Sequence, residues 1–218
     1  ADLAPGDVLL LENLRFHPGE EKPDTEAGFV DALARLGQCY VNDAFGTAHR
    51  AHASLVGVAE HFDQRAAGYL MAKELDYFGQ ALASPRRPFV ALLGGAKVSD
   101  KILLIENLLD KVDAILVGGA MAYTFLAARG IAVGGSRVED DKLDLARELL
   151  AKAADQGVDL LLPFDHVCGR EFDEATEVRR VESVEIPEGW MGLDIGAGTI
   201  ASFGERIAAA GTIVWNGP

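Results

Sequence analysis

The sequence predicts an α/β protein in which two parallel-sheet domains are joined by a helix. From Phe89 onward, short apolar runs alternate with segments of helical period, which is the pattern of a parallel sheet covered by helices. Residues 8–62 show a shorter version of this pattern, and apolar residues recur at helical spacing over 68–83. We therefore expect one domain over residues 1–70, an interdomain helix over 71–83 and a second domain over 84–218.

The carboxy-terminal domain contains the clearest elements. Its apolar runs predict strands at Phe89–Leu93, Ala114–Val117, Val158–Leu162 and Ile213–Trp215, with a shorter one at Met191–Asp194. The segments between them predict helices at Ser99–Leu109, Ala120–Ala128, Asp141–Gln156 and Thr199–Ala210. Each helix has a glycine after its end or a Ser, Asp or Thr at its start, as helix boundaries prefer.

The amino-terminal domain is predicted from weaker signals. Strands are expected at Val8–Leu11 and Cys39–Asn42, around a helix that begins near Asp24 and stops at Gly37. The chain lacks an initiating Met, begins almost directly with a strand-like run and ends just after another. We therefore expect both domains to be incomplete in this chain.

Composition and charge exclude several classes of partner. The 218 residues include 34 Asp or Glu and 20 Lys or Arg, and the net charge of −14 opposes binding to nucleic acid. No apolar run reaches the ~18 residues of a membrane span, and the first residues do not resemble a secretion signal. We expect a cytoplasmic monomer with no nucleic-acid or membrane partner. Cys39 and Cys168 have no C-x-x-C neighbour, which indicates two buried thiols.

Glycines follow the predicted strands at the edge where open α/β sheets bind ligands. The segments are Gly94-Gly95, Gly118-Gly119, Gly196-Ala197-Gly198 and Asn216-Gly217. Because glycine permits close backbone approach and positive φ angles, we expect a nucleotide-sized ligand at this edge. Tight strand-to-helix turns are the simpler alternative for any single pair.

Two lysines stand at the start of the helix that follows Gly94-Gly95. Lys97 and Lys101 share a helix face, so their ammonium groups and the free N–H groups of the helix start can converge on phosphate. The alternative is a pair of surface lysines balanced by Asp100 and Glu106. Neither G-x-x-x-x-G-K-[ST] nor G-x-G-x-x-G is present, so a different phosphate-binding architecture is indicated.

The amino-terminal domain carries anion-binding side chains of another kind. Arg15 and Arg50 each follow a predicted strand, and guanidinium groups suit carboxylate or phosphate, with surface ion pairs as the alternative. The spacing of His49 and His52 resembles a metal pair, but no third ligand is suitably placed, and we expect no metal site. Paired carboxylates such as Glu20-Glu21 and Asp140-Asp141 are interpreted as solvated charges.

Segments along essentially the whole chain resemble motifs of the phosphoglycerate kinase family, in the family's order. They are Glu12–Phe16, Asn42–His52, Leu93–Lys101, Gly118–Ala122, Gly189–Gly196 and Val214–Pro218. The resemblance implies two Rossmann-like domains, one for phosphoglycerate and one for nucleotide, that close around the connecting helix. It also implies reversible phosphoryl transfer from 1,3-bisphosphoglycerate to ADP in glycolysis, giving 3-phosphoglycerate and ATP, with Mg²⁺ as the metal that accompanies the nucleotide.

The resemblance also implies roles for particular residues. Lys97 and Arg50 would act in catalysis. Phosphoglycerate would be bound by Arg15, Arg50, His49 and His52. Among the nucleotide-binding residues, Lys97 would stabilise the phosphoryl group in transfer, Lys101 would hold the nucleotide phosphates and Asn216 would contact the nucleotide. The adenine pocket would be lined by Gly95, Gly119, Phe172, Gly192 and Leu193.

The sequence also departs from the family pattern. Arg137 stands where the family usually has an apolar adenine contact, and Ala197 where it usually has proline. The family's further amino-terminal arginine and its carboxy-terminal loop, with the aspartate that holds Mg²⁺, lie outside this sequence. We therefore expect this chain alone to be inactive, and a non-catalytic nucleotide-binding module or pseudoenzyme is the alternative. An NAD-linked oxidoreductase would need the dinucleotide fingerprint that is absent.

Overall fold

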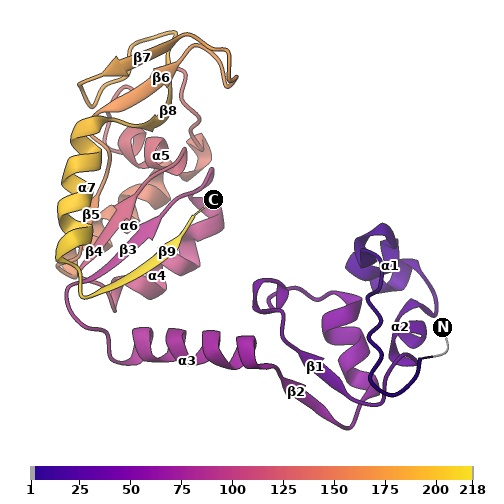
Figure 1. Cartoon of the computed structure of the whole chain (residues 1–218). Helices are drawn as coiled ribbons and strands as arrows, with labels where there is room; N and C mark the ends of the chain where they lie inside the picture. The colour runs from indigo at the N-terminus through magenta and orange to yellow at the C-terminus, as the bar shows by residue number, and fades with distance from the viewer. Residues whose placement is uncertain (1–2, 218) are drawn as a thin grey trace. The chain divides into compact units, whose positions relative to one another are not determined.

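The computed structural model describes residues 3–217, and the chain divides into two compact units, Ala1–Gln80 (unit 1) and Ala81–Pro218 (unit 2). The division falls within helix α3 (Tyr69–Ala83), the segment in which the sequence predicts the interdomain helix (Figure 1). The assignment of residues 1–70, 71–83 and 84–218 to separate functional domains stays a prediction.

Unit 2 is built on a four-stranded parallel sheet. Its strands are β3 (Phe89–Leu93), β4 (Ala114–Val117), β5 (Asp159–Leu161) and β9 (Thr212–Asn216). The strands lie in the order β5-β4-β3-β9, and every neighbouring pair is parallel. Each of these strands was expected from an apolar run, so the prediction of a parallel α/β sheet is confirmed here.

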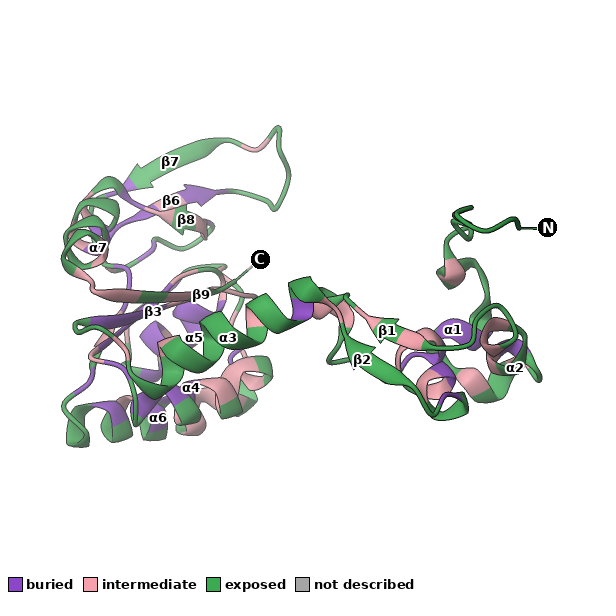
Figure 2. Cartoon of the chain, turned by 60° about the horizontal axis from the view of Figure 1, so that its bottom comes forward, coloured by how far each residue is buried: buried purple, intermediate pink, exposed green. Residues whose placement is uncertain are grey.

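Helices cover both faces of this sheet because apolar side chains alternate along its strands. The helices are α4 (Ile102–Leu109), α5 (Met121–Ala128), α6 (Leu143–Asp155) and α7 (Ala197–Ala209). Phe89, Ala91 and Leu93 share a core with residues of α4, α5 and α6, whereas Val90 packs with Phe203 of α7 on the other face. Figure 2 shows buried residues concentrated in β3 and α5, whereas α3 is mostly exposed.

A separate antiparallel sheet lies in the carboxy-terminal part of unit 2. It contains β6 (His166–Gly169), β7 (Val178–Val181) and β8 (Met191–Ile195), in the order β7-β6-β8. The placement of Met191–Asp194 among the parallel strands was therefore wrong, because β8 pairs antiparallel with β6. Strands β6 and β7 were not expected, and β7 carries no apolar run because its sequence is Val-Arg-Arg-Val with only Val181 buried.

Gly196 and Gly198 consequently do not belong to the glycine-lined edge of the parallel sheet. A Cβ added at Gly196 would come within 2.3 Å of the Asp165 carboxyl carbon. The backbone nitrogens of Gly198 and Thr199 each donate to this carboxylate at 2.7 Å, at the start of α7. These glycines therefore allow Asp165 to cap a helix, and they provide no ligand-binding turn of the parallel sheet.

Unit 1 is smaller and mostly made of short elements. Its helices are α1 (Pro18–Glu21) and α2 (Phe29–Ala34), and its strands are β1 (Tyr40–Asn42) and β2 (Arg65–Ala67), which pair in parallel. Helical turns lie at Leu14–Phe16, Pro23–Thr25, Phe45–Thr47, Ala53–Gly57 and Val58–His61. The helix expected from Asp24 to Gly37 is interrupted because Gly28 has a φ of 80°.

Two other expectations for unit 1 were wrong. Residues Val8–Leu11 form no strand with any described residue, and Val8 and Leu10 are each 92% exposed. An apolar run alone does not make a strand, because its backbone groups need a neighbouring strand. Cys39 is exposed, whereas Cys168 is buried as expected. Within residues 3–217, no helix is both long and apolar enough to cross a membrane.

Candidate functional site

Two glycine turns lie side by side at the carboxyl edge of the parallel sheet. Gly95 follows β3 with a φ of 145°, and Gly119 follows β4 with a φ of 68°. A Cβ added at Gly119 would lie 2.7 Å from the carbonyl oxygen of Gly95 and 2.8 Å from its nitrogen. The Gly95 carbonyl also accepts a hydrogen bond of 3.0 Å from the backbone nitrogen of Met121. The close approach of backbone explains why residue 119 is glycine, and the positive φ explains glycine at 95.

A cavity of about 520 Å³ opens beside these turns. Its lining comes from the two turns, the loop around Arg137, the loop that carries Phe172, and strand β8. The lining residues are Gly95, Ala96, Gly119, Ala120, Gly135, Arg137, Phe172, Met191, Gly192 and Leu193. The volume is in the range of small-molecule sites, and the lining is mostly apolar. The structure thus brings together Gly95, Gly119, Phe172, Gly192 and Leu193 in one cavity.

The predicted phosphate-binding side chains lie at the same edge of the sheet. The ammonium group of Lys101 donates a hydrogen bond to the side-chain oxygen of Asn216, at the end of β9. This contact joins two predicted site residues that are 115 positions apart in the chain. Lys97 is exposed, and its side chain makes no hydrogen bond or ion pair with any of residues 3–217. Lys101 is therefore held in place by Asn216, and Lys97 is free to bind an anion.

The helix start beside these lysines is already occupied by a carboxylate. Glu139 accepts hydrogen bonds from the backbone nitrogens of Val98, at 2.6 Å, and Ser99, at 3.1 Å. It also accepts one from the Ser99 hydroxyl at 2.6 Å. Partial burial alone would raise the pKa of Glu139, but the hydrogen bonds from Ser99 and Val98 outweigh it and lower the pKa. The expectation of free N–H groups for phosphate was therefore wrong at Val98 and Ser99.

In unit 1, two of the predicted substrate-binding residues face carboxylates of α1. Arg15 Nε lies 3.3 Å from Glu21, and His52 Nδ1 lies 3.6 Å from Glu20. The side chains of His49 and Arg50 are exposed and make no hydrogen bond or ion pair with any residue that the structure describes. The structure therefore links Arg15 and His52 to the same short helix and leaves His49 and Arg50 free.

Glu20 is a buried residue that the sequence analysis misplaced in solvent. It is 4% exposed, and its carboxylate accepts hydrogen bonds from the Ser54 hydroxyl at 2.6 Å and the Ser54 nitrogen at 3.1 Å. The half-buried Tyr40 donates a hydrogen bond from its hydroxyl to the carbonyl oxygen of Ser54 at 3.0 Å. No local signal in the sequence pointed to the burial of Glu20, because the partner Ser54 lies 34 residues away.

A sequence model of the phosphoglycerate kinase family matches residues 1–218 of this chain. The chain belongs to the phosphoglycerate kinase family.

Curated relatives and solved structures agree with this membership. The chain is 60% identical over 217 residues to a phosphoglycerate kinase of Anaeromyxobacter sp. (strain K), a match that covers 100% of this chain and 54% of that protein. It is 55% identical over 216 residues to one of Chlorobium phaeobacteroides, covering 99% of this chain and 54% of that protein. The chain thus spans about half the length of these relatives.

The fold comparison points to the same family. The structure of phosphoglycerate kinase from Coxiella burnetii is similar with a TM-score of 0.78 and 41% identity, over 100% of this chain and 56% of that one. The enzyme from Pyrococcus horikoshii is similar with a TM-score of 0.79 and 32% identity, over 98% of this chain and 55% of that one. The Rossmann-like fold class expected for incomplete phosphoglycerate kinase domains is supported by these neighbours.

Proposed function

We propose that this chain supplies substrate-binding parts of an enzyme that transfers a phosphoryl group reversibly between 1,3-bisphosphoglycerate and ADP, giving 3-phosphoglycerate and ATP in glycolysis. In this proposal unit 2 binds ADP or ATP, and unit 1 binds phosphoglycerate. The observation that carries it is the cavity in unit 2, because residues implied by family resemblance to line an adenine pocket all line this one space.

The cations of unit 2 support a role in phosphoryl transfer. Such reactions depend mainly on positioning the two substrates and on positive charge around the transferring group. Lys101, held by Asn216, is suited to bind nucleotide phosphates in a fixed position. Lys97 has no partner among residues 3–217 that would neutralise its charge, so it is suited to the catalytic contact with the transferring group.

The basic residues of unit 1 support the assignment of the second substrate. Arg50 and His49 are exposed and unpaired within the described part of the chain, so they are available to a phosphate or carboxylate. Arg15 and His52 face Glu21 and Glu20, which would hold their side chains in place before a ligand arrives. We assign Arg50 the catalytic contact of this unit and assign Arg15, His49 and His52 to substrate binding.

Mg²⁺ is the metal that the family implies for the nucleotide. Within residues 3–217, no group of three or more His, Cys, Asp or Glu side chains is placed to hold a metal ion. We therefore keep the expectation that Mg²⁺ accompanies the nucleotide and that its protein ligand lies outside this sequence, while the residues described here would supply the positive charge of lysine and arginine. The proposal further includes a monomeric, cytoplasmic protein with small anionic ligands, and the net charge of −14 favours ligands other than nucleic acid.

Calorimetric titration of the 218-residue chain with ADP and with 3-phosphoglycerate tests the division of substrates between the units. Arg50→Ala should weaken 3-phosphoglycerate binding about tenfold and leave ADP affinity unchanged, since a charged hydrogen bond is lost in one site only. Lys101→Ala should have the opposite selectivity. Arg35→Ala, an exposed position in unit 1, is the control for loss of a positive charge. Equal losses of both ligands in either variant would contradict the division, and absence of ADP binding would contradict the assignment of unit 2.

A kinetic test requires a protein of the family's full length that carries this sequence. In that protein we expect Lys97→Ala to lower kcat about 100-fold or more with a small change in the KM for ADP, because the lost contact forms in the transition state. A raised KM with unchanged kcat would instead make Lys97 a ground-state ligand. The 218-residue chain alone should bind nucleotide without turnover, and steady catalysis by it would refute that part of the proposal.

A further inference from the structure

The cavity of unit 2 contains one feature that its glycine and apolar lining does not explain. Among the described residues that line it, Arg137 is the one with a charged side chain. The other side chains are those of Ala, Met, Leu and Phe, which offer no strong hydrogen-bond acceptor. The guanidinium group of Arg137 makes no hydrogen bond or ion pair with any of residues 3–217. Arg137 is exposed, so an arginine whose donors have no partner among the described residues lines an otherwise apolar cavity.

The backbone around Arg137 is firmly held. The preceding residue, Ser136, accepts a hydrogen bond of 2.9 Å from the nitrogen of Gly192 in β8. Gly135 donates one of 2.8 Å to the carbonyl oxygen of Trp190. Two positions after Arg137, Glu139 is fixed by Val98 and Ser99. The side chain of Arg137 therefore starts from a fixed point beside the cavity.

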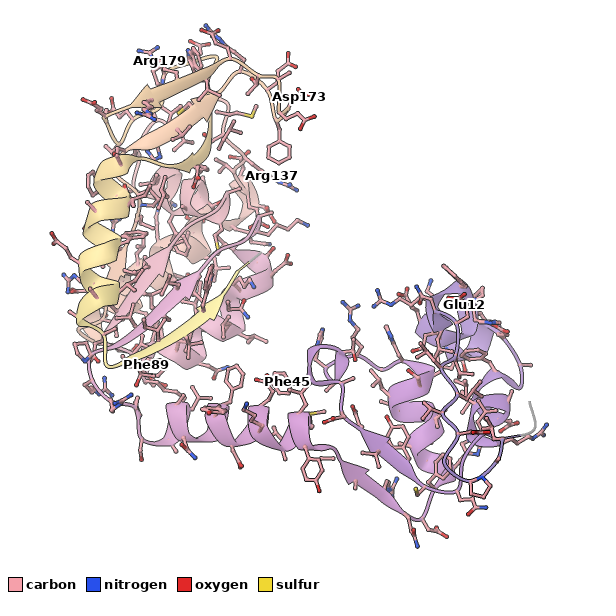
Figure 3. The ribbon with its side chains drawn as sticks, viewed as in Figure 1. Glu12, Phe45, Phe89, Arg137, Asp173 and Arg179 are labelled. Atoms are coloured by element: carbon pink, nitrogen blue, oxygen red, sulfur yellow. The ribbon has the colours of Figure 1, made fainter. Side chains whose placement is uncertain are left out.

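The loop that carries Phe172 is held by contacts with Trp190 and Gly189, and Trp190 also binds the backbone before Arg137. Arg170 stacks on the Trp190 ring at 4.0 Å and donates to the carbonyl oxygen of Gly189 at 3.3 Å, which holds the loop that carries Phe172. Phe172 is 91% exposed, so its ring is available to a ligand. Figure 3 shows Arg137 and Asp173, the neighbour of Phe172, on the same side of unit 2. A flat base entering this cavity would meet an aromatic ring and a guanidinium group.

We propose that Arg137 is a specificity-determining residue that raises the affinity of this cavity for 6-oxopurine bases, guanine and hypoxanthine, relative to adenine. Arginine has five N–H donors and no acceptor. Guanine and hypoxanthine present two adjacent acceptors, O6 and N7, which match the guanidinium fork, whereas adenine presents N7 beside an amino group that is itself a donor. Arg137 therefore gains a two-bond contact with a 6-oxopurine that it cannot make with adenine.

This inference rests on the proposed nucleotide site, and its test separates the two. Calorimetric titration of the 218-residue chain with ADP, GDP and IDP measures all three bases with identical phosphates. Arg137→Leu should weaken GDP and IDP binding about fivefold, the low end of the range for an arginine–guanine pair because the site is open to solvent, and leave ADP binding unchanged. Arg137→Lys keeps the positive charge but removes the paired N–H donors of the guanidinium group. This variant should therefore also lose most of the preference for GDP and IDP over ADP.

Arg86→Leu is the matched control, since Arg86 is an exposed arginine of unit 2 outside the cavity lining. It should leave all three affinities in their original ratio. Equal weakening of ADP, GDP and IDP by Arg137→Leu would place Arg137 on the phosphates and overturn the base preference while keeping the nucleotide site. An unchanged ratio of GDP to ADP affinity in both Arg137 variants would also overturn it. Absence of binding by all three nucleotides would overturn the proposed site together with this inference.

Discussion

The carboxylate of Glu139 accepts a hydrogen bond of 2.6 Å from the hydroxyl of Ser99, 40 residues earlier in the chain. Together with the bond from the Val98 nitrogen, this contact ties the segment after Lys97 to the segment after Arg137. The start of the lysine-bearing helix is therefore neutralised by the protein itself. Any phosphate bound nearby must draw its positive charge chiefly from side chains such as Lys97 and Lys101.

Glu139→Gln should destabilise the chain by about 1–3 kcal/mol at neutral pH, the usual cost of weakening hydrogen bonds that involve a charged group. Because the native pKa of Glu139 is lowered, its contribution to stability is present above the unfolded value near 4.5 and is lost as the pH falls through the native pKa. The urea-unfolding curves of variant and parent should thus converge under acid conditions. Asp140→Asn, the same charge change at an exposed neighbour, should change stability little. A constant gap at all pH values would mean that the Glu139 charge is irrelevant.

Gly119→Ala should destabilise unit 2 by about 2–4 kcal/mol, since it combines backbone strain with overpacking. The new methyl group would lie 2.7 Å from the Gly95 carbonyl oxygen, at a φ of 68°. Gly130→Ala is the matched control, because Gly130 has a φ of 80° and no atom within 4 Å of an added Cβ. The control should lose only about 1 kcal/mol, the strain of a positive φ. Equal losses in denaturant titrations would show that the two turns do not depend on their close packing.

Much of the parallel sheet could be predicted because burial leaves a local mark on the sequence. Strand β4 is buried at every position, and its run of Ala114, Ile115, Leu116 and Val117 is apolar throughout. Strand β8 was located, but its sheet was not, because strand direction depends on a partner that the local sequence does not name. The Val8–Leu11 run shows the converse error, since apolar residues without a strand partner remain exposed.

In the candidate site too, residues with a local sequence signal could be predicted, and residues fixed by distant contacts could not. Gly95 and Gly119 were found from their places after apolar runs, because the positive φ that each adopts is a local property of a strand-to-helix turn. Phe172 was expected only from family resemblance, since an exposed aromatic residue in a loop has no periodic signal. Glu139 was missed because its partners lie 40 residues away, and Glu20 because its partner Ser54 lies 34 residues away. A charged residue that is buried by a distant contact is locally indistinguishable from a solvated one.

His166 should make the chain sensitive to mild acid. Burial, opposed by the Val184 hydrogen bond and by Asp165, lowers the pKa of this histidine below 6.5, and its Nδ1 is buried without a partner among the described residues. As the pH falls below about 6.5, the unfolded chain takes up a proton that the native chain does not, so stability falls by up to about 1.4 kcal/mol per pH unit. His166→Leu should flatten unfolding free energies measured from pH 7 to 5, whereas His49→Ala, at an exposed position, should not. An unchanged slope in His166→Leu would show that another group controls this range.

Lys101 and Asn216 should behave as one unit in nucleotide binding, and Lys97 as an independent residue. The Lys101 ammonium group donates to the Asn216 side chain, so removing either residue disturbs the same contact. Lys101→Ala should weaken ADP binding about tenfold, Asn216→Ala by less, and the double variant by little more than Lys101→Ala alone, a coupling of about 0.5–1 kcal/mol. Lys97 makes no hydrogen bond with either residue within the described part of the chain, so Lys97→Ala combined with Asn216→Ala should give the sum of the single effects. Calorimetric titration of the three single variants and two double variants with ADP measures both cycles at once. Additive losses in the first cycle would mean that Asn216 contacts the nucleotide directly and does not position Lys101.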